Sequence, residues 1–180
     1  MIASIANGPA GVQRPPARPA SKLVVRSARI GEYDGADRLD ITRIGIGGKP
    51  DPLGVLFAPS ESILRPAIRA REIAEELRHD ADDLTKAFSG QDRRILVARA
   101  DQLEAEAWAK YEPLYLAEMR ASYREHRRAW EELLGRPSLV VLCFCVLRPG
   151  APQRCHRALL RSRILPALGA TDGGEIGASS

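Results

Sequence analysis

The sequence has few of the features that mark secreted or membrane-spanning proteins. It contains three cysteines in 180 residues, and these cluster between Cys143 and Cys155, which does not fit a disulfide framework. The longest apolar run, Leu139–Leu147, is far shorter than the roughly 20 residues that cross a bilayer. The N-terminus lacks the basic and long apolar segments of a secretory signal. We therefore expect a cytoplasmic protein with reduced thiols and no membrane partner.

The net charge of the sequence excludes few classes of protein. The formal net charge is +4, which only weakly indicates an anionic partner. The length and the 44% hydrophobic content are typical of one globular domain. We place that domain at residues 22–176. Pro-rich residues 1–21 and the C-terminal residues 177–180 are predicted to be flexible tails.

Alternating strand and helix patterns predict an α/β fold. Strands are expected at Lys22–Ile30, Arg38–Ile46, Gly54–Ala58 and Ser138–Val146, the last as a central strand buried on both faces. Helices are expected at 60–79, 93–107, 108–134 and 153–168, with a connection at Arg78–Asp92. These elements predict a single compact, Rossmann-like domain with a small, mainly parallel sheet flanked by helices.

An apolar stripe with helical spacing crosses residues 108–134. Its members are Trp108, Tyr111, Tyr115, Met119, Tyr123, His126, Trp130 and Leu133. Such a stripe is more often part of a core than a ligand platform, and we expect His126 to lie in the core or at its boundary. The basic run Arg120, Arg124, Arg127 and Arg128 is more typical of a solvated helix face than of a phosphate site.

The candidate site lies where the strand Ser138–Val146 leads into the last predicted helix. Ligands often bind beyond the carboxyl ends of strands, near helix N-termini that attract anions. Cys143 and Cys145 would share one face of the strand, although buried core positions are the more common role for such cysteines. Cys155 and His156 follow near the helix start.

Three kinds of chemistry fit these residues. Cys155 could be a nucleophile with His156 as proton carrier, activated by the helix N-terminus and neighbouring arginines. Alternatively, a metal site would use Cys143, Cys145, Cys155 and His156, although the spacing matches no standard zinc finger. Thirdly, Arg154, His156 and Arg157 could hold a phosphate. Further ligand-binding candidates are Arg38, Arg43, Arg120 and Tyr123, some of which could line the same cleft.

Short motifs occur at Val140–Cys145, Cys155-His156-Arg157, Leu168-Gly169-Ala170 and Gly174-Glu175-Ile176, and also at 33–35, 38–43, 57–60 and 118–124. In these motifs, above all in Leu-Cys-x-Cys followed by Cys-His-Arg, the chain resembles a bacterial and phage family of unknown function that includes the YeaO-like proteins. The resemblance covers most of 22–176. It implies a compact α/β domain and points to the Cys-His-Arg motif, but it supplies no activity.

The working hypothesis is an α/β protein that binds a phosphate-bearing ligand, such as a nucleotide or a nucleic-acid end, at the Cys155-His156-Arg157 loop. No cofactor is required, and the hypothesis leaves open whether the protein is an enzyme. The main rival is a non-enzymatic module whose Arg-rich helix contacts nucleic acid or a protein. A third alternative is a scaffold stabilised by a metal ion. The sequence determines neither the reaction nor the oligomeric state.

Overall fold

The computed structural model describes residues 22–83, 90–146 and 152–177. Its elements are, in chain order, β1 (Val24–Arg29), β2 (Arg38–Asp40), the 3₁₀-helix η1 (Gly54–Phe57), α1 (Glu61–Asp83), α2 (Gly90–Glu125), α3 (Arg127–Leu134), β3 (Ser138–Cys143), α4 (His156–Leu159), the π-helix η3 (Leu160–Ile164), α5 (Leu165–Ala167) and β4 (Thr171–Glu175). The predicted tail 1–21 and residues 178–180 lie outside the described residues.

The four strands form one parallel sheet in the order β2-β3-β1-β4. In the central pair, Val25 lies beside Leu139 and Arg29 beside Cys143. Strand β3 is buried from Leu139 to Cys143, because it has a strand on each side and packed side chains on both faces. The predicted α/β class with a small parallel sheet and a central strand at β3 is therefore confirmed.

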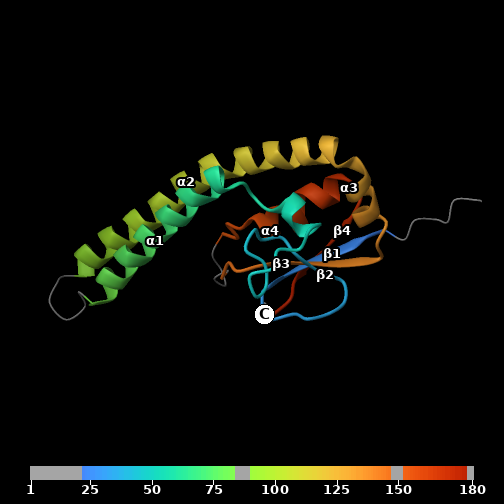
Figure 1. The fold of residues 1–180 in the computed structure, drawn as a ribbon. Coiled ribbons are helices and arrows are strands. Elements are labelled where there is room, and N and C mark those ends of the chain that lie inside the picture. The colour runs from blue at the N-terminus through green and yellow to red at the C-terminus, as the bar shows by residue number, and fades with distance from the viewer. Residues whose placement is uncertain (1–21, 84–89, 147–151, 178–180) are drawn as a thin grey trace, which may run out of the picture.

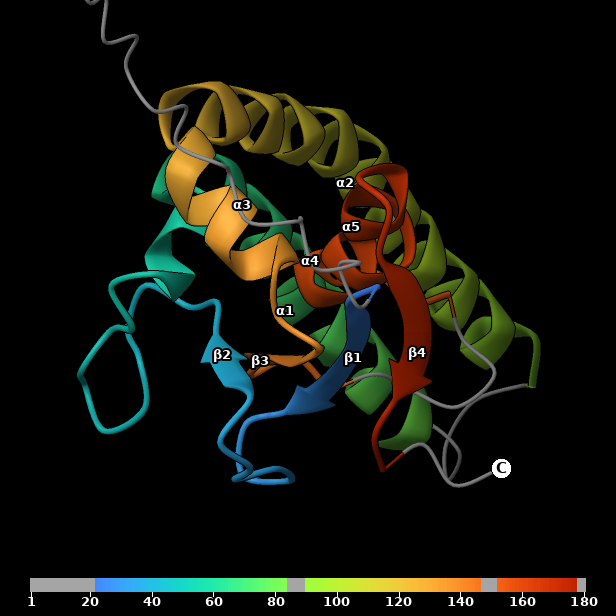
Figure 2. The same cartoon turned by 90° about the vertical axis from the view of Figure 1, so that its right-hand side faces the viewer.

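The main core lies on one face of the sheet. The strand residues Val25, Leu39, Leu139 and Val141, and Ile41 just after β2, pack there with the helix residues Tyr115, Trp130, Leu133, Leu160 and Leu165. Figures 1 and 2 show the helices on this same side of the sheet. A smaller cluster of Ala28, Val140 and Leu142 packs on the opposite face with Ile30, Tyr33 and Ile176. Because strand side chains alternate, Cys143 at the end of β3 points to the helix side.

Helices α1 and α2 pack side by side as a long pair that extends beyond the sheet (Figure 1). Arg78 on α1 joins them, since its guanidinium donates to Glu104 at 3.0 Å and to Asp101 at 2.8 Å on α2. The predicted boundary between a helix at 93–107 and a helix at 108–134 is wrong, because α2 continues without a break from Gly90 to Glu125. Pro113 lies inside α2, where it removes one helix hydrogen bond.

Two predicted strands in the first third of the chain are wrong in type or length. Gly54–Phe57 forms the 3₁₀-helix η1 instead of a strand. Asp51 Oδ1 accepts hydrogen bonds from the amides of Leu53 and Gly54 at 2.9 and 3.0 Å and so starts a turn. Gly54 also lies against β2, where a Cβ would come within 1.7 Å of the Asp40 carbonyl oxygen. The strand predicted at Arg38–Ile46 ends at Asp40, whose Oδ1 accepts the Thr42 amide at 2.9 Å.

Further differences concern the second half of the chain. The strand predicted to reach Val146 ends at Cys143, and the helix predicted from Gln153 begins at His156 and contains a π-helical turn. Strand β4 is not predicted at all, because Thr-Asp-Gly-Gly-Glu has low strand propensity and pairs only where β1 offers its edge. The part of the chain that the structure describes includes no helix with the length and hydropathy that a membrane span needs.

The aromatic stripe is a core feature, with one correction. Tyr111, Tyr115, Met119 and Trp130 are buried, as predicted. His126 is exposed instead, because it lies at the break between α2 and α3 with non-helical backbone angles of φ −117° and ψ 37°. The change of chain direction takes its side chain off the stripe.

Candidate functional site

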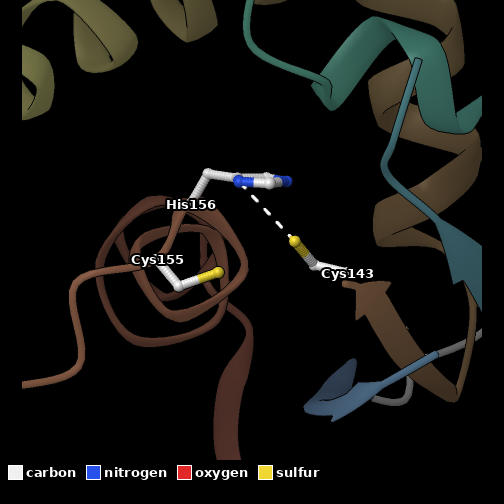
Figure 3. A group of neighbouring side chains, drawn as sticks. All are labelled: Cys143, Cys155 and His156. Atoms are coloured by element: carbon white, nitrogen blue, oxygen red, sulfur yellow. Dashed lines mark hydrogen bonds between the residues drawn. The ribbon is translucent and has the colours of Figure 1, made fainter. Parts of the chain in front are cut away.

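The site forms where the chain leaves β3 and returns at the start of α4. Cys143 is the last residue of β3, and Cys155 is the N-cap of α4. Figure 3 shows that the side chains of Cys143, Cys155 and His156 lie together. All three are buried, and their possible ligand atoms lie within 4.8 Å of one another. The structure thus gathers the predicted cysteine and histidine residues into one cluster.

Cys145 joins this cluster although it is not on the strand. Its Sγ lies 3.5 Å from Cys143 Sγ, and its amide donates to the same sulfur at 3.5 Å. All three cysteines are free thiols, and Cys145 is half-buried whereas Cys143 and Cys155 are buried. The predicted proximity of Cys143 and Cys145 is correct, but it comes from a turn after β3.

The contacts of His156 fix the orientation of its ring. Nε2 lies 3.2 Å from the carbonyl oxygen of Ile41. Because a carbonyl only accepts, Nε2 carries the proton of the neutral ring, and Nδ1 keeps its lone pair. Nδ1 faces Cys143 Sγ at 3.9 Å. Burial lowers the pKa of His156, but the sulfurs of Cys155 and Cys145 outweigh it and the net shift is upward.

Arg71 on α1 brings a positive charge to the thiols. Its Nη1 donates to Cys145 Sγ at 3.4 Å, and its Nη2 donates to the Arg154 carbonyl oxygen at 3.0 Å. Sequence reasoning missed this residue, because 74 positions separate Arg71 from Cys145 and Arg71 is one of many arginines on an amphipathic helix. Only the tertiary fold, which brings Arg71 to Cys145 and Arg154, gives it a role.

Arg157 shapes the backbone around the cluster. It is only 2% exposed, and its Nη1 donates to the carbonyl oxygens of Cys143 at 3.2 Å and Cys145 at 2.7 Å. Its Nη2 bonds Glu175 Oε1 on β4 at 2.5 Å, and Arg161 lies 3.7 Å from the other oxygen of that carboxylate. Arg157 therefore holds the turn that presents both sulfurs. The one sequence signal for Glu175 was its place in the Gly-Glu-Ile motif.

The three thiols differ in acidity. The hydrogen bond to Cys145 raises the pKa of Cys143 to about 12. The same contact lowers the pKa of Cys145, with further contributions from Cys155 and Arg71. Burial raises the pKa of Cys155. Negative charge in the cluster is therefore most favourable on Cys145, whereas the sequence pointed to Cys155.

Three of the remaining predicted ligand-binding residues line two cavities whose described lining does not include His156. Arg38 lines a cavity of about 540 Å³ beside β2, and Arg43 donates to the Pro59 carbonyl oxygen at 2.6 Å. Arg120 and Tyr123 line a groove of about 490 Å³. Neither cavity is lined by a member of the cluster. The expectation of one common cleft is therefore not met by these two cavities.

One comparison with known proteins assigns the chain to a family. Residues 59–167 match the family described as the active DUF488-N3 subclade. The matched residues run from α1 to α5 and include all three cysteines and His156. The chain belongs to that family. Family membership confirms the expected domain of unknown function. The relation to YeaO-like proteins stays a prediction. The motif Gly174-Glu175-Ile176 lies beyond the matched residues. No curated protein and no solved structure matches this DUF488-N3 chain.

Proposed function

We propose that this DUF488-N3 protein is a metal-thiolate protein, in which Cys143, Cys155 and His156 bind a thiophilic ion such as zinc. The observation that carries this proposal is the convergence of three buried ligand atoms within 4.8 Å of one another. Cys145 Sγ lies 3.5 Å from Cys143 Sγ, beside the place of a fourth ligand. Three thiols and one imidazole form a ligand set that tetrahedral zinc accepts.

The distances support an ion of this size. Zinc bonds of about 2.3 Å to sulfur and about 2.0 Å to nitrogen place neighbouring ligand atoms of a tetrahedron about 3.5 to 3.8 Å apart. In the structure, Cys143 Sγ lies 3.5 Å from Cys145 Sγ and 3.9 Å from His156 Nδ1. Small side-chain rotations would bring the remaining ligand atoms, which lie within 4.8 Å of one another, to the same spacing.

The surrounding hydrogen bonds support it too. Metal-binding histidines usually donate their second ring N–H to a carbonyl or carboxylate, and His156 Nε2 has that partner in Ile41. Deprotonated thiols would give the site a negative charge, which needs compensation in a buried place. The guanidinium groups of Arg71 and Arg157 contact the Cys145 sulfur and the two cysteine carbonyl oxygens, respectively.

A catalytic role fits the side of the cluster at which Cys145 is only half-buried. Catalytic zinc sites keep three protein ligands and one exchangeable position, whereas structural sites are closed by four. Here three ligands are buried and the fourth candidate, Cys145, is half-buried. The word "active" in the family description supports an enzyme without naming its reaction.

Metal analysis of the freshly purified protein tests the proposal. We expect about one zinc per chain after growth with zinc. Cys155→Ser should lose most of it, whereas Cys145→Ser should retain the ion with lower affinity, since the three buried ligands remain. Circular dichroism of both variants checks that they fold. Metal-free wild type that also fails to take up zinc in vitro would overturn the proposal, as would full zinc content in Cys155→Ser.

A reactive, metal-free thiol is the second candidate, and the contact between Arg71 Nη1 and the Sγ of the half-buried Cys145 favours it. A cation beside a thiol stabilises its thiolate. This candidate moves the nucleophile from the predicted Cys155, whose sulfur is buried, to Cys145. Alkylation followed by mass spectrometry separates the two: metal-free protein should react first at Cys145, and a first reaction at Cys155 would contradict this assignment.

A phosphate-bearing ligand at the Cys155-His156-Arg157 loop has weaker support. Arg157 is buried and already bonded to three groups, and Arg154 Nη1 lies 3.5 Å from Glu104 Oε2. An incoming phosphate would have to displace these partners. We therefore expect phosphate to leave the thermal midpoint of the protein unchanged; a rise that Arg154→Ala abolishes would restore this function.

A further inference from the structure

A second cavity, the Arg120 groove, lies between α2, α3 and the η3–α5 segment. Its volume is about 490 Å³, which is within the usual range for small-molecule sites. Its apolar lining includes Leu116, Ile164 and Leu168, and the buried side chains of Met119 and Trp130 close it from the core side. The groove therefore offers an apolar surface about the size of a small organic molecule.

Arginines surround this apolar surface. Arg120 and Arg124 come from α2, and Arg163 comes from η3. Arg163 pairs with Glu112, whereas neither Arg120 nor Arg124 has an acidic partner among the described residues. Residues four apart on a helix lie on one face, where like charges repel. An anion between Arg120 and Arg124 would remove that repulsion.

The π-helix η3 is a separate feature that points to this place. π-helical turns are rare and frequently occur at functional sites. Here the turn directs Arg161 inward, where it lies 3.2 Å from Asp172 and 3.7 Å from Glu175, while Arg163 and Ile164 line the groove. The same continuous segment begins at His156, so the groove and the cysteine cluster lie along one helical element.

We propose that the Arg120 groove binds a small ligand with an apolar body and one phosphate or carboxylate group. The anionic group lies between the Arg120 and Arg124 guanidinium groups, which donate charge-assisted hydrogen bonds. The apolar body lies against Leu116, Ile164 and Leu168. The groove is a binding site separate from the cysteine cluster, and its occupation does not require a bound metal.

Calorimetric titration of the full chain tests this with four probes: octyl phosphate, adenosine 5′-monophosphate, octanol and inorganic phosphate. At least one of the first two should bind tenfold or more tightly than inorganic phosphate, and octanol should bind weakly. A preference for octyl phosphate would assign a flexible alkyl body, and a preference for the nucleotide a planar one. If neither binds more tightly than inorganic phosphate, the proposal is wrong.

Matched variants locate the binding. Replacing Arg120 and Arg124 together by Ala should weaken binding of the preferred probe at least tenfold, because both charges are lost. Arg94→Ala is the control, since Arg94 is also exposed on α2 but lies about 39 Å from Arg120 along the helix. Equal affinity in the double variant and the wild type would overturn the proposal, provided that both have the same thermal midpoint.

Two further measurements separate this site from other possibilities. The metal-free Cys155→Ser protein, if folded, should bind the probe as the wild type does, so that failure of the metal proposal leaves this one intact. A 20-nucleotide DNA serves as the competing partner. One outcome would assign the two arginines to a nucleic-acid surface: the wild type binds the DNA but neither amphipathic probe, and the double variant loses DNA binding. That outcome would overturn the proposal of a small-molecule site in the groove.

Discussion

The cysteine cluster and the α1–α2 pair use the same residue type, arginine, in opposite ways. Next to the cluster, Arg157 is 2% exposed and pairs with a Glu175 side chain that is 9% exposed. On α1, Arg65 pairs with Glu61 four residues away, and these side chains are 77% and 67% exposed. Removing one partner of a buried pair leaves an unpaired charge in the interior, whereas water replaces the partner of an exposed one. A partner from another element therefore holds Arg157 at the site, whereas Arg65 pairs with a residue of its own helix on an exposed face.

The largest expected effect is at Glu175. Glu175→Gln should lower the free energy of unfolding by about 3 to 5 kcal/mol, because Arg157 and Arg161 would lose the carboxylate that compensates their charge. Urea unfolding at neutral pH measures this. Glu61→Gln is the matched control, with an expected loss of no more than about 0.5 kcal/mol. Similar losses in the two variants would remove the distinction between the two regions.

Removal of the metal should have the next largest effect, if the cluster binds zinc as proposed. An ion that binds only the folded state stabilises it by about 2.7 kcal/mol when its free concentration is 100 times the dissociation constant. A strong chelator should therefore lower the thermal midpoint of the wild type by several degrees. Cys155→Ser should show no change with chelator, and a wild type that is equally insensitive would count against the metal.

Tyr115 extends the comparison of buried and exposed partners to an uncharged group, its hydroxyl. Its hydroxyl is buried and donates to the Phe57 carbonyl oxygen at 2.8 Å, which joins α2 to η1. Tyr115→Phe should cost about 1 to 3 kcal/mol in the free energy of unfolding, because that buried carbonyl would lose a donor. Tyr123→Phe is the comparison variant for urea unfolding, because its ring is half-buried and the described residues supply no hydrogen-bond partner for its hydroxyl. A loss as large at Tyr123 would show that the hydroxyl of Tyr115 is not the cause.

The smallest expected effect concerns a local pair, Tyr33 and Asp37. The Tyr33 hydroxyl donates to Asp37 Oδ1 at 2.5 Å, and this bond, followed by one from Ser138, lowers the pKa of Asp37 below its ordinary value of 3.8. A carboxyl with a lowered pKa in the folded state stabilises the fold above pH 3.8 and loses that contribution as the pH falls through the folded value. Tyr33→Phe should therefore lose slightly less stability than the wild type between pH 5 and pH 3 in urea titrations.

The candidate site was only partly predictable. The pattern of β3 identified a central strand, and the nearby Cys155-His156 pair indicated that ligand atoms would meet at its end. Arg71 could not be found in this way, because it contacts Cys145 from 74 positions away. Glu175 could not be found either, because it bonds Arg157 from β4, a strand that the sequence does not predict. The preference for Cys155 as nucleophile failed to anticipate its burial, since the depth of an N-cap residue depends on the helix that covers it.

The sequence by itself determined the α/β class, the buried strand β3 and the core role of the aromatic stripe, and it named the cysteine and histidine residues of the candidate site. These follow from local periodicity and from residue types that are close in the chain. Only the tertiary structure decided that Cys145 turns back onto Cys143, that Arg71 reaches its sulfur, and that Thr171–Glu175 becomes a strand. These features depend on free energy gained by burial and by pairing between distant segments, which no local pattern records.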